Sequence, residues 1–353
     1  MIQAHPRPLR FLVPGTGGRW RCGGLLVELQ TAGLVAQLRP SEVVTYRHRE
    51  DDHPFLEDLL RQEAPPGEAL WIVSWGFDVP KLLRQLAGRA VAYHAHSCGY
   101  GFNLPAGVPV LAVSRNTLAY WGAHSPRNPL FLVPNALAPM WLERGAAASA
   151  HGVIGAAQRP IDVLVQRRKS SGSVLRRLVP ALRARGLRVE VQSGWVDDLV
   201  DLFNSATVVL YDSAEYWRGR GVSEGFGLPP IEALACGCVV FSSLNHALAD
   251  HLEPGLLGHQ IGFGTMAADL DRIAAAVADP QGWRPPAEQL QTLLQRFQES
   301  AQLLPWERAL SAIDGHWDRL LQGEPPLRLA PAWWIRWRQR REQLGRRLWR
   351  SAS

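Results

Sequence analysis

Short apolar runs alternate with helix-like segments along most of this chain, and this rhythm constrains its fold more than any other feature. In the first half of the sequence the runs lie at residues 9–14, 70–74, 90–94, 109–113 and 130–133. In the second half they lie at residues 161–165, 187–192, 207–211 and 238–242. Strands that alternate with helices form parallel sheets covered by helices on both faces. We therefore expect an α/β protein with two doubly wound domains.

The length of 353 residues also fits two domains of ordinary size. A stretch of small, mostly uncharged residues between the two sets of strands indicates a linker. We place the N-terminal domain at residues 1–145, the linker at 146–159 and the C-terminal domain at 160–305. A further helix is predicted at residues 306–322, and residues 323–353 form a basic tail rich in Trp and Arg.

The net charge of +6 is concentrated at the end of the chain. Residues 325–353 contain eight arginines and one glutamate, a balance of +7, so the remainder carries −1. A surface for nucleic acid would have to be this tail alone, and we expect no nucleic-acid partner. No apolar run approaches the roughly 20 residues that span a bilayer. The N-terminus lacks the apolar core of a secretory signal peptide. We expect a cytoplasmic protein.

The four cysteines, at positions 22, 98, 236 and 238, match no zinc-ligand spacing and no C-x-x-C redox pair. Cys236 and Cys238 lie in an apolar stretch. We expect both to be small buried side chains without a chemical role, which is how unpaired cysteine usually behaves.

The segment at residues 223–243 (SEGFGLPPIEALACGCVVFSS) carries the clearest chemical signal. Gly225 and Gly227 allow a backbone to approach a ligand closely. Two prolines then open a helix, whose N-terminus suits a pyrophosphate. Glu224 and Glu232 flank this turn, and each carboxylate can accept hydrogen bonds from hydroxyls. The alternative is a plain strand–turn–helix unit with a capping glutamate.

Residues 224–237 resemble the signature of retaining glycosyltransferases of the GT-B fold, in particular glycosyltransferase family 4. That signature has two glutamates separated by seven residues, with Gly-Phe-Gly-Leu after the first and Ala-Leu-Ala-Cys-Gly after the second. The resemblance covers the C-terminal half well and the N-terminal half loosely. It implies two Rossmann-like domains that face a central cleft, with the helix at residues 306–322 packing back towards the N-terminal domain.

The resemblance also implies roles for individual residues. Glu224 would contact hydroxyls of the donor sugar, and Glu232 would bind the ribose of the nucleotide. The backbone amides expected along the sugar and the phosphates are those of Gly225, Phe226, Gly227 and Leu228.

Two cations follow the first strand of the C-terminal half, where the family neutralises its diphosphate leaving group. Arg168 and Lys169 are the residues that match, although the family spaces its two cations further apart. A guanidinium and an ammonium both suit a diphosphate. The alternative is a solvated basic turn.

Two features of the N-terminal half resemble the family more weakly. Gly17 and Gly18 follow the first strand, where the family has a glycine-rich loop facing donor and acceptor; a plain tight turn is the alternative. His94 and His96 share one face of a strand. The family has a histidine there that reaches the transferred sugar, and we favour His96, with a structural role as the alternative. No third metal ligand is evident beside these histidines, and the resemblance implies no metal ion and no other cofactor.

The function implied is transfer of a hexose from a nucleotide-diphosphate sugar to an acceptor hydroxyl, with retention at the anomeric carbon. His96 and Glu224 are the predicted catalytic residues. The acceptor, whether glycan, lipid or small metabolite, stays open. A nucleotide-sugar epimerase of the same fold and a non-catalytic nucleotide-sugar-binding subunit are the alternatives. No pair of carboxylates is placed for glycosidase chemistry.

The tail at Ala332–Arg350 is predicted to form a helix in which tryptophan and arginine dominate. Such a helix suits the interface of an anionic membrane. A solvated extension and a helix packed on the protein are the alternatives. Peripheral contact with the inner membrane face is therefore a hypothesis.

Overall fold

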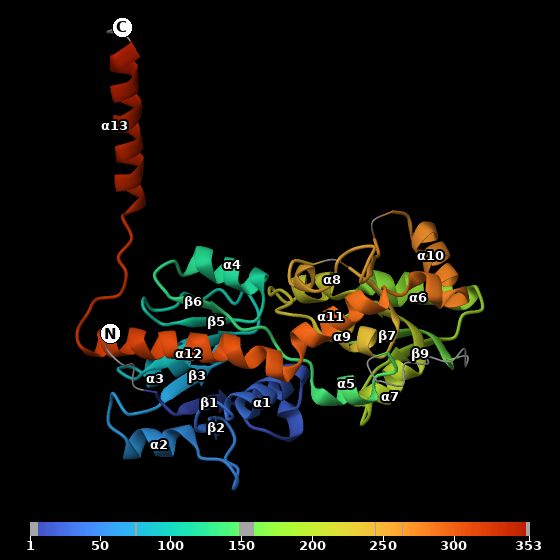
Figure 1. Ribbon diagram of the computed structural model, residues 1–353, viewed down its shortest axis with the longest axis horizontal. Helices are drawn as coiled ribbons and strands as arrows, with labels where there is room; N and C mark the ends of the chain where they lie inside the picture. Colours follow the sequence, from blue (N-terminus) through green and yellow to red (C-terminus); the bar gives the residue numbers. More distant parts are fainter. Residues whose placement is uncertain (1–5, 75, 148–158, 244, 263, 351–353) are drawn as a thin grey trace.

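The computed structural model describes residues 6–74, 76–147, 159–243, 245–262 and 264–350. Two parallel β-sheets, each covered by helices, lie end to end along the long axis of the molecule (Figure 1). The predicted α/β fold with two Rossmann-like domains is confirmed. Most of the predicted linker, residues 148–158, lies outside the described residues.

The N-terminal sheet has six parallel strands in the order β2-β1-β3-β4-β5-β6. The strands are β1 (Leu9–Val13), β2 (Ser41–Thr45), β3 (Leu70–Val73), β4 (Val91–Ala95), β5 (Val110–Ala112) and β6 (Leu130–Leu132). Its helices are α1 (Gly23–Val35), α2 (Leu56–Gln62), α3 (Val79–Gln85) and α4 (Arg115–His124). Alternate residues of β1 enter different cores: Phe11 packs on one face of the sheet and Leu12 on the other.

The C-terminal sheet has five parallel strands in the order β11-β10-β9-β7-β8. The strands are β7 (Ile161–Gln166), β8 (Val189–Gln192), β9 (Ala206–Tyr211), β10 (Val239–Ser242) and β11 (His259–Gln260). Its helices are α6 (Val179–Ala184), α7 (Leu199–Asn204), α8 (Ser213–Arg218), α9 (Leu228–Ala235), α10 (Met266–Ala278) and α11 (Ala287–Phe297). Cys236 and Cys238 are buried in this core as small side chains, as predicted.

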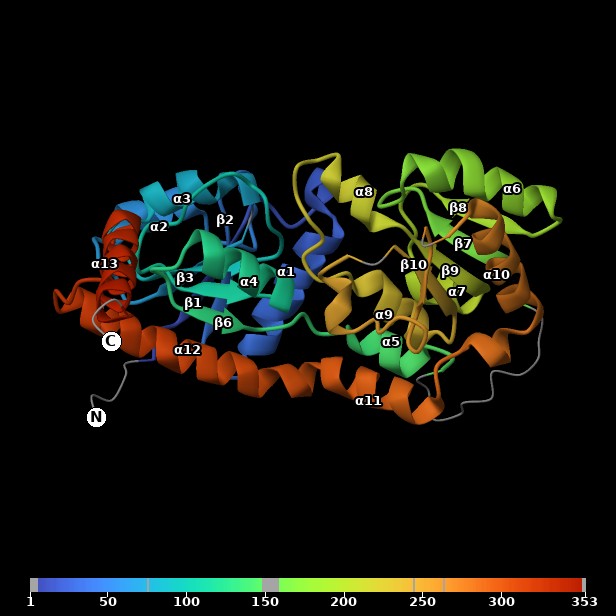
Figure 2. The same cartoon turned by 90° about the horizontal axis from the view of Figure 1, so that it is seen from above.

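The chain crosses between the domains twice. Helix α5 (Pro139–Arg144) lies in the range predicted for the N-terminal domain, yet Trp141 packs against Phe203 in the C-terminal core. Helix α12 (Glu299–Leu321) then returns and buries Trp306 and Ile313 in the core of the N-terminal domain. Viewed from above, α11 and α12 run along one long side of the molecule (Figure 2).

The final helix, α13 (Ala332–Arg350), stands away from both domains at the end of an extended stretch (Figure 1). Two of its large apolar side chains are well exposed, Trp333 at 69% and Trp337 at 49%. Among the described residues, no helix is both long enough and apolar enough to cross a membrane.

Candidate functional site

The loops that follow β4 and precede α9 meet between the two domains. The amide of Ser223 donates to the carbonyl of Cys98 at 3.2 Å, and the hydroxyl of Ser97 donates to the carbonyl of Ser223. A Cβ built on Gly225 would overlap the carbonyl oxygen of His96. Ligands of open parallel sheets bind beyond the carboxyl ends of the strands. This contact therefore brings the ligand-binding edge of one sheet against that of the other.

Glu224 is held firmly at this junction and is 7% exposed. Its Oε2 accepts hydrogen bonds from the hydroxyl of Tyr211 at 2.6 Å and the indole N–H of Trp217 at 2.7 Å. Its Oε1 lies 3.9 Å from Nζ of Lys169. Two neutral donors thus fix one carboxylate oxygen, while the other faces only a cation. Burial, followed by the charge of Glu224, raises the pKa of Tyr211 well above its ordinary value.

Lys169 reaches the site from the loop after β7 through an unusual backbone conformation. Its φ of 74° makes it the only residue other than glycine with positive φ in the described parts of the chain. Such a conformation is strained for a side chain of this kind and tends to occur at functional sites. The ammonium lies 5.9 Å from the ring centroid of Tyr211 and 5.8 Å from that of Trp217. Lys169 and Glu224 therefore share one aromatic enclosure.

Glu232 lies in the second turn of α9 and is partly exposed. Burial raises its pKa to about 7, although the charge of Lys169 acts in the opposite direction. No residue in the described ranges donates a hydrogen bond to this carboxylate. A carboxylate that is partly withdrawn from water and has no partner can accept hydrogen bonds from a hydroxyl-bearing ligand.

Gly227 shapes the turn between the two glutamates. Its φ is 83°, and a Cβ at this position would collide with the side chain of Leu248. Phe226 is 3% exposed, and its ring packs on His251 and Phe297. Only its backbone is therefore available to a ligand.

The N-terminus of α9 offers fewer donors than its position suggests. Leu228 is the first residue of the helix, and the two that follow are prolines, which carry no N–H. The sequence resemblance implied the amides of Gly225, Phe226, Gly227 and Leu228, and that role stays a prediction.

Three further predicted residues are not joined to Glu224 by any contact among the described residues. Arg168 is exposed beside Lys169. Gly17 and Gly18 are exposed in the loop after β1, where Gly18 has a φ of 55°. Gly18 thus adopts a left-handed conformation that glycine tolerates. Such a conformation is typical of a tight turn.

His94 and His96 meet a third residue that the sequence reading missed. Oε2 of Glu28, on α1, lies 2.8 Å from Nδ1 of His94 and 2.7 Å from Nε2 of His96. Glu28 is fully buried and His94 is 1% exposed, whereas the side chain of His96 is 19% exposed. The expectation that no third metal-ligand type stands beside these histidines was wrong, because the fold brings Glu28 within their reach.

A sequence signal for Glu28 did exist. Leu25, Glu28, Ala32 and Val35 are all buried at helical spacing on α1. A glutamate on the apolar face of a helix is rarely buried without a partner. The partner could not be named from the sequence, because it lies 66 residues away on another element.

Comparisons with known proteins bear on the fold. Neither known protein families nor curated proteins give a match to this sequence. Among solved structures, sucrose-phosphate synthase from Thermosynechococcus elongatus aligns with a TM-score of 0.59 and 17% identity, over 90% of this chain and 100% of that one. Anabaena HepE, in complex with UDP and glucose, aligns with a TM-score of 0.60 and 16% identity, over 87% of this chain and 100% of that one.

AviGT4, a glycosyltransferase involved in avilamycin A biosynthesis, aligns with a TM-score of 0.57 and 18% identity, over 90% of this chain and 99% of that one. These neighbours are GT-B glycosyltransferases, and at such low identity the likeness concerns the fold alone. The chain is similar to them over nearly their whole length, and the predicted GT-B fold is confirmed.

Proposed function

We propose that this protein is a retaining glycosyltransferase that moves a hexose from a nucleotide-diphosphate sugar to an acceptor hydroxyl. The observation that carries the proposal is the grouping of Glu224, Glu232 and Lys169 around the Gly227 turn, at the carboxyl edge of the C-terminal sheet. HepE, which shares the fold, has been seen with UDP and glucose. Membership of glycosyltransferase family 4 is part of the proposal.

In this proposal the two glutamates hold opposite ends of the donor. Glu232 accepts hydrogen bonds from the ribose hydroxyls, which supply the partners that its carboxylate lacks. Glu224 uses Oε1 for a hydroxyl of the sugar, because Oε2 is already occupied by Tyr211 and Trp217. His96 approaches the same sugar from the N-terminal domain.

The departing diphosphate needs positive charge as its bond to the sugar breaks. Lys169 supplies an ammonium from within the site, and Arg168 supplies a second cation by turning inward from the surface. The amides of Gly227 and Leu228 add backbone donors. We propose that these groups suffice without a metal ion or other cofactor, and that the glycines at 17 and 18 border the donor from across the cleft.

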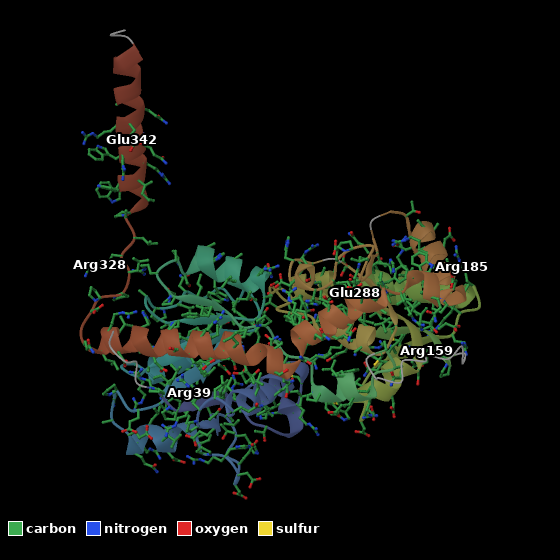
Figure 3. All side chains as sticks on the ribbon, in the orientation of Figure 1. Arg39, Arg159, Arg185, Glu288, Arg328 and Glu342 are labelled. Atoms are coloured by element: carbon green, nitrogen blue, oxygen red, sulfur yellow. The ribbon has the colours of Figure 1, made fainter. Side chains whose placement is uncertain are left out.

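The N-terminal domain is where the acceptor binds in this proposal, as a glycan, a lipid or a small metabolite. We further propose a cytoplasmic protein that contacts the inner membrane face through α13 and has no nucleic-acid partner. The side chains drawn on α13 stand away from the two domains (Figure 3). Trp333 and Trp337 are exposed on a helix rich in arginine, which suits anionic lipid.

A panel of UDP-, GDP- and ADP-sugars tests the function. A nucleotide sugar present at about 100 times its Kd should stabilise the fold by about 2.7 kcal/mol, which a thermal shift detects. The stabilising compound is then incubated with the protein, and products are followed by NMR. Release of nucleoside diphosphate with a sugar of retained anomeric configuration supports the proposal.

Other outcomes would contradict it. An altered sugar still joined to its nucleotide would indicate an epimerase, and binding without turnover under any condition would indicate a binding subunit. Glu232→Gln should show a smaller thermal shift than the wild type at the same ligand concentration. Glu288→Gln is the matched control, because Glu288 is an exposed carboxylate on α11 and should respond like the wild type (Figure 3).

A further inference from the structure

Glu28 is the centre of a buried hydrogen-bond network between α1 and the end of β4. A single oxygen, Oε2, lies within hydrogen-bond distance of one ring nitrogen from each of His94 and His96. A carboxylate oxygen of an ionised group only accepts, so both nitrogens must carry the protons. His94 is therefore protonated on Nδ1 and His96 on Nε2.

The ionisation of Glu28 follows from these partners. Burial by itself would raise its pKa, but the charge and hydrogen bond of His94, together with His96, lower the pKa below its ordinary value. Burial lowers the pKa of His94, and His96 adds to this effect. The network thus consists of an ionised Glu28 and a neutral His94, with Trp306 of α12 packed 5.3 Å from the His94 ring.

The two histidines differ in whether their second ring nitrogen can be reached by a ligand. Nε2 of His94 and Oε1 of Glu28 are enclosed and have no hydrogen-bond partner. Nδ1 of His96 also has no partner within the described ranges, but it is not among the enclosed atoms, and its side chain is 19% exposed. His96 is also the residue whose carbonyl lies against Gly225, at the junction of the domains. Nδ1 of His96 is therefore the one nitrogen of the network that a ligand can reach.

The same three residues could in principle bind a transition metal, since each offers a suitable ligand atom. A histidine that binds a metal normally donates its other N–H to a second partner, which fixes the ring. Nε2 of His94 has no such partner. The hydrogen-bonded arrangement accounts for the 2.7 and 2.8 Å distances without an ion.

We propose that Glu28 is a positioning residue: it fixes the ring and the tautomer of His96, so that Nδ1 of His96 presents a hydrogen-bond acceptor to a hydroxyl of the transferred sugar. The part that concerns the sugar rests on the proposed function. The tautomers of the two histidines do not depend on it. An acceptor at this position selects a hydroxyl and disfavours a sugar in which that hydroxyl is missing or replaced by fluorine.

Nitrogen NMR of the full chain labelled in its histidines tests the network directly. The 11 histidines are resolved by their two-bond proton–nitrogen correlations, and the signals of interest are assigned by comparison with His94→Gln and His96→Gln. We expect the Nδ1–H tautomer for His94, although the free side chain favours Nε2–H, and the Nε2–H tautomer for His96. The opposite tautomer at either residue would overturn the proposal. The proposal would also be overturned if the purified protein contained one equivalent of a transition metal bound to these nitrogens.

Two variants separate charge from shape. Glu28→Leu removes both acceptors, and His94 should return to the Nε2–H form. Glu28→Gln keeps the size of the side chain but removes its charge, so it holds the two rings more weakly, and it is used if the leucine variant does not fold. Thr31→Val is the control, because Thr31 is a buried residue on α1 whose hydroxyl donates only to the carbonyl of Val27. The control should leave both tautomers unchanged.

Turnover of the donor gives the second measurement. Glu28→Gln should lower kcat by up to about 100-fold, the loss expected when a reacting group is misplaced by about 1 Å. Affinity for UDP should change less than twofold by calorimetry, because the nucleotide lies at Glu232. With a donor whose contacting hydroxyl is replaced by fluorine, Glu28→Gln and the wild type should turn over at similar rates.

An unchanged kcat in Glu28→Gln, with an active wild type, would refute the role in positioning. A wild type that turns over no nucleotide sugar would instead refute the proposed function, and the histidine tautomers would then decide the Glu28 proposal by themselves.

Discussion

Replacing Glu232 with glutamine should stabilise the ligand-free protein above neutral pH while weakening its binding of the donor. Burial raises the pKa of Glu232 from an ordinary value of 4.5 to about 7. The folded state therefore holds this proton more tightly than the unfolded state does. The contribution of the group to stability is complete below about pH 4.5 and is lost as the pH rises through 7.

The difference between the two pKa values sets the magnitude. At about 1.4 kcal/mol for each tenfold change in proton affinity, ionising Glu232 in the folded protein costs about 3 kcal/mol at pH 8. Glutamine carries no charge, so this cost of ionisation disappears in the variant. Its amide still has no hydrogen-bond partner, which destabilises the folded state and makes the net gain smaller. We expect Glu232→Gln to gain roughly 1–3 kcal/mol at pH 8 and close to nothing at pH 4.5.

The assay is the difference in thermal or urea stability between the variant and the wild type, measured from pH 4.5 to 8. Groups that titrate equally in both proteins cancel in this difference. Glu288→Gln, a substitution on the exposed surface of α11, is measured alongside as the control. A flat curve for Glu232→Gln would refute the reasoning, because it would mean that Glu232 ionises alike in the folded and unfolded chains.

The same proton links ligand binding to pH. In the proposed function, ribose hydroxyls donate to the ionised form of Glu232. Binding of the donor should then release a proton, and its affinity should increase as the pH rises from 6 to 8. UDP-glucose is the suitable probe, because its diphosphate is esterified at both ends and does not titrate near neutrality. Glu232→Gln should bind it at least tenfold more weakly, about 1.4 kcal/mol, with no pH dependence in this range.

Three further predictions concern the glycines and the tail. Gly225→Ala should push the domains apart at the carbonyl of His96, which small-angle scattering would detect as a larger radius of gyration than that of the wild type; an unchanged radius would contradict the close approach. Gly227→Ala combines a φ of 83° with a collision against Leu248, and it should lower the free energy of unfolding by about 1–3 kcal/mol in a urea titration. Deleting residues 327–353 should abolish flotation with liposomes containing anionic lipid and leave turnover of a soluble donor unchanged, whereas a full-length chain that never floats would end the membrane proposal.

The strand–helix rhythm was sufficient to predict the fold, because a buried parallel strand needs a continuous apolar run and local sequence supplies it. The edge strand β2 was missed for the same reason. Only two of its five residues are buried, so its sequence Ser-Glu-Val-Val-Thr contains no long apolar run. The crossing of α5 to the C-terminal domain was also unforeseen, since a short helix with Trp141 does not say which core will receive that side chain.

The two glycines of the signature separate local from tertiary causes. Both glycines were expected to let the backbone approach a ligand. Gly227 has a positive φ, which is a local property of the chain. The structure places Gly225 against the backbone of His96, a contact between residues 129 positions apart. Nothing in the local sequence records such a contact.

The sequence by itself determined the α/β class, the two domains and the turn that carries Glu224 and Glu232, because these depend on apolar spacing and on residues that are neighbours along the chain. Only the tertiary structure decided which charges act together. It brought Lys169 to Glu224, left Arg168 outside and joined Glu28 to both histidines. Electrostatic interactions and hydrogen bonds depend on distances in space and on burial, and both are set only when separate elements pack.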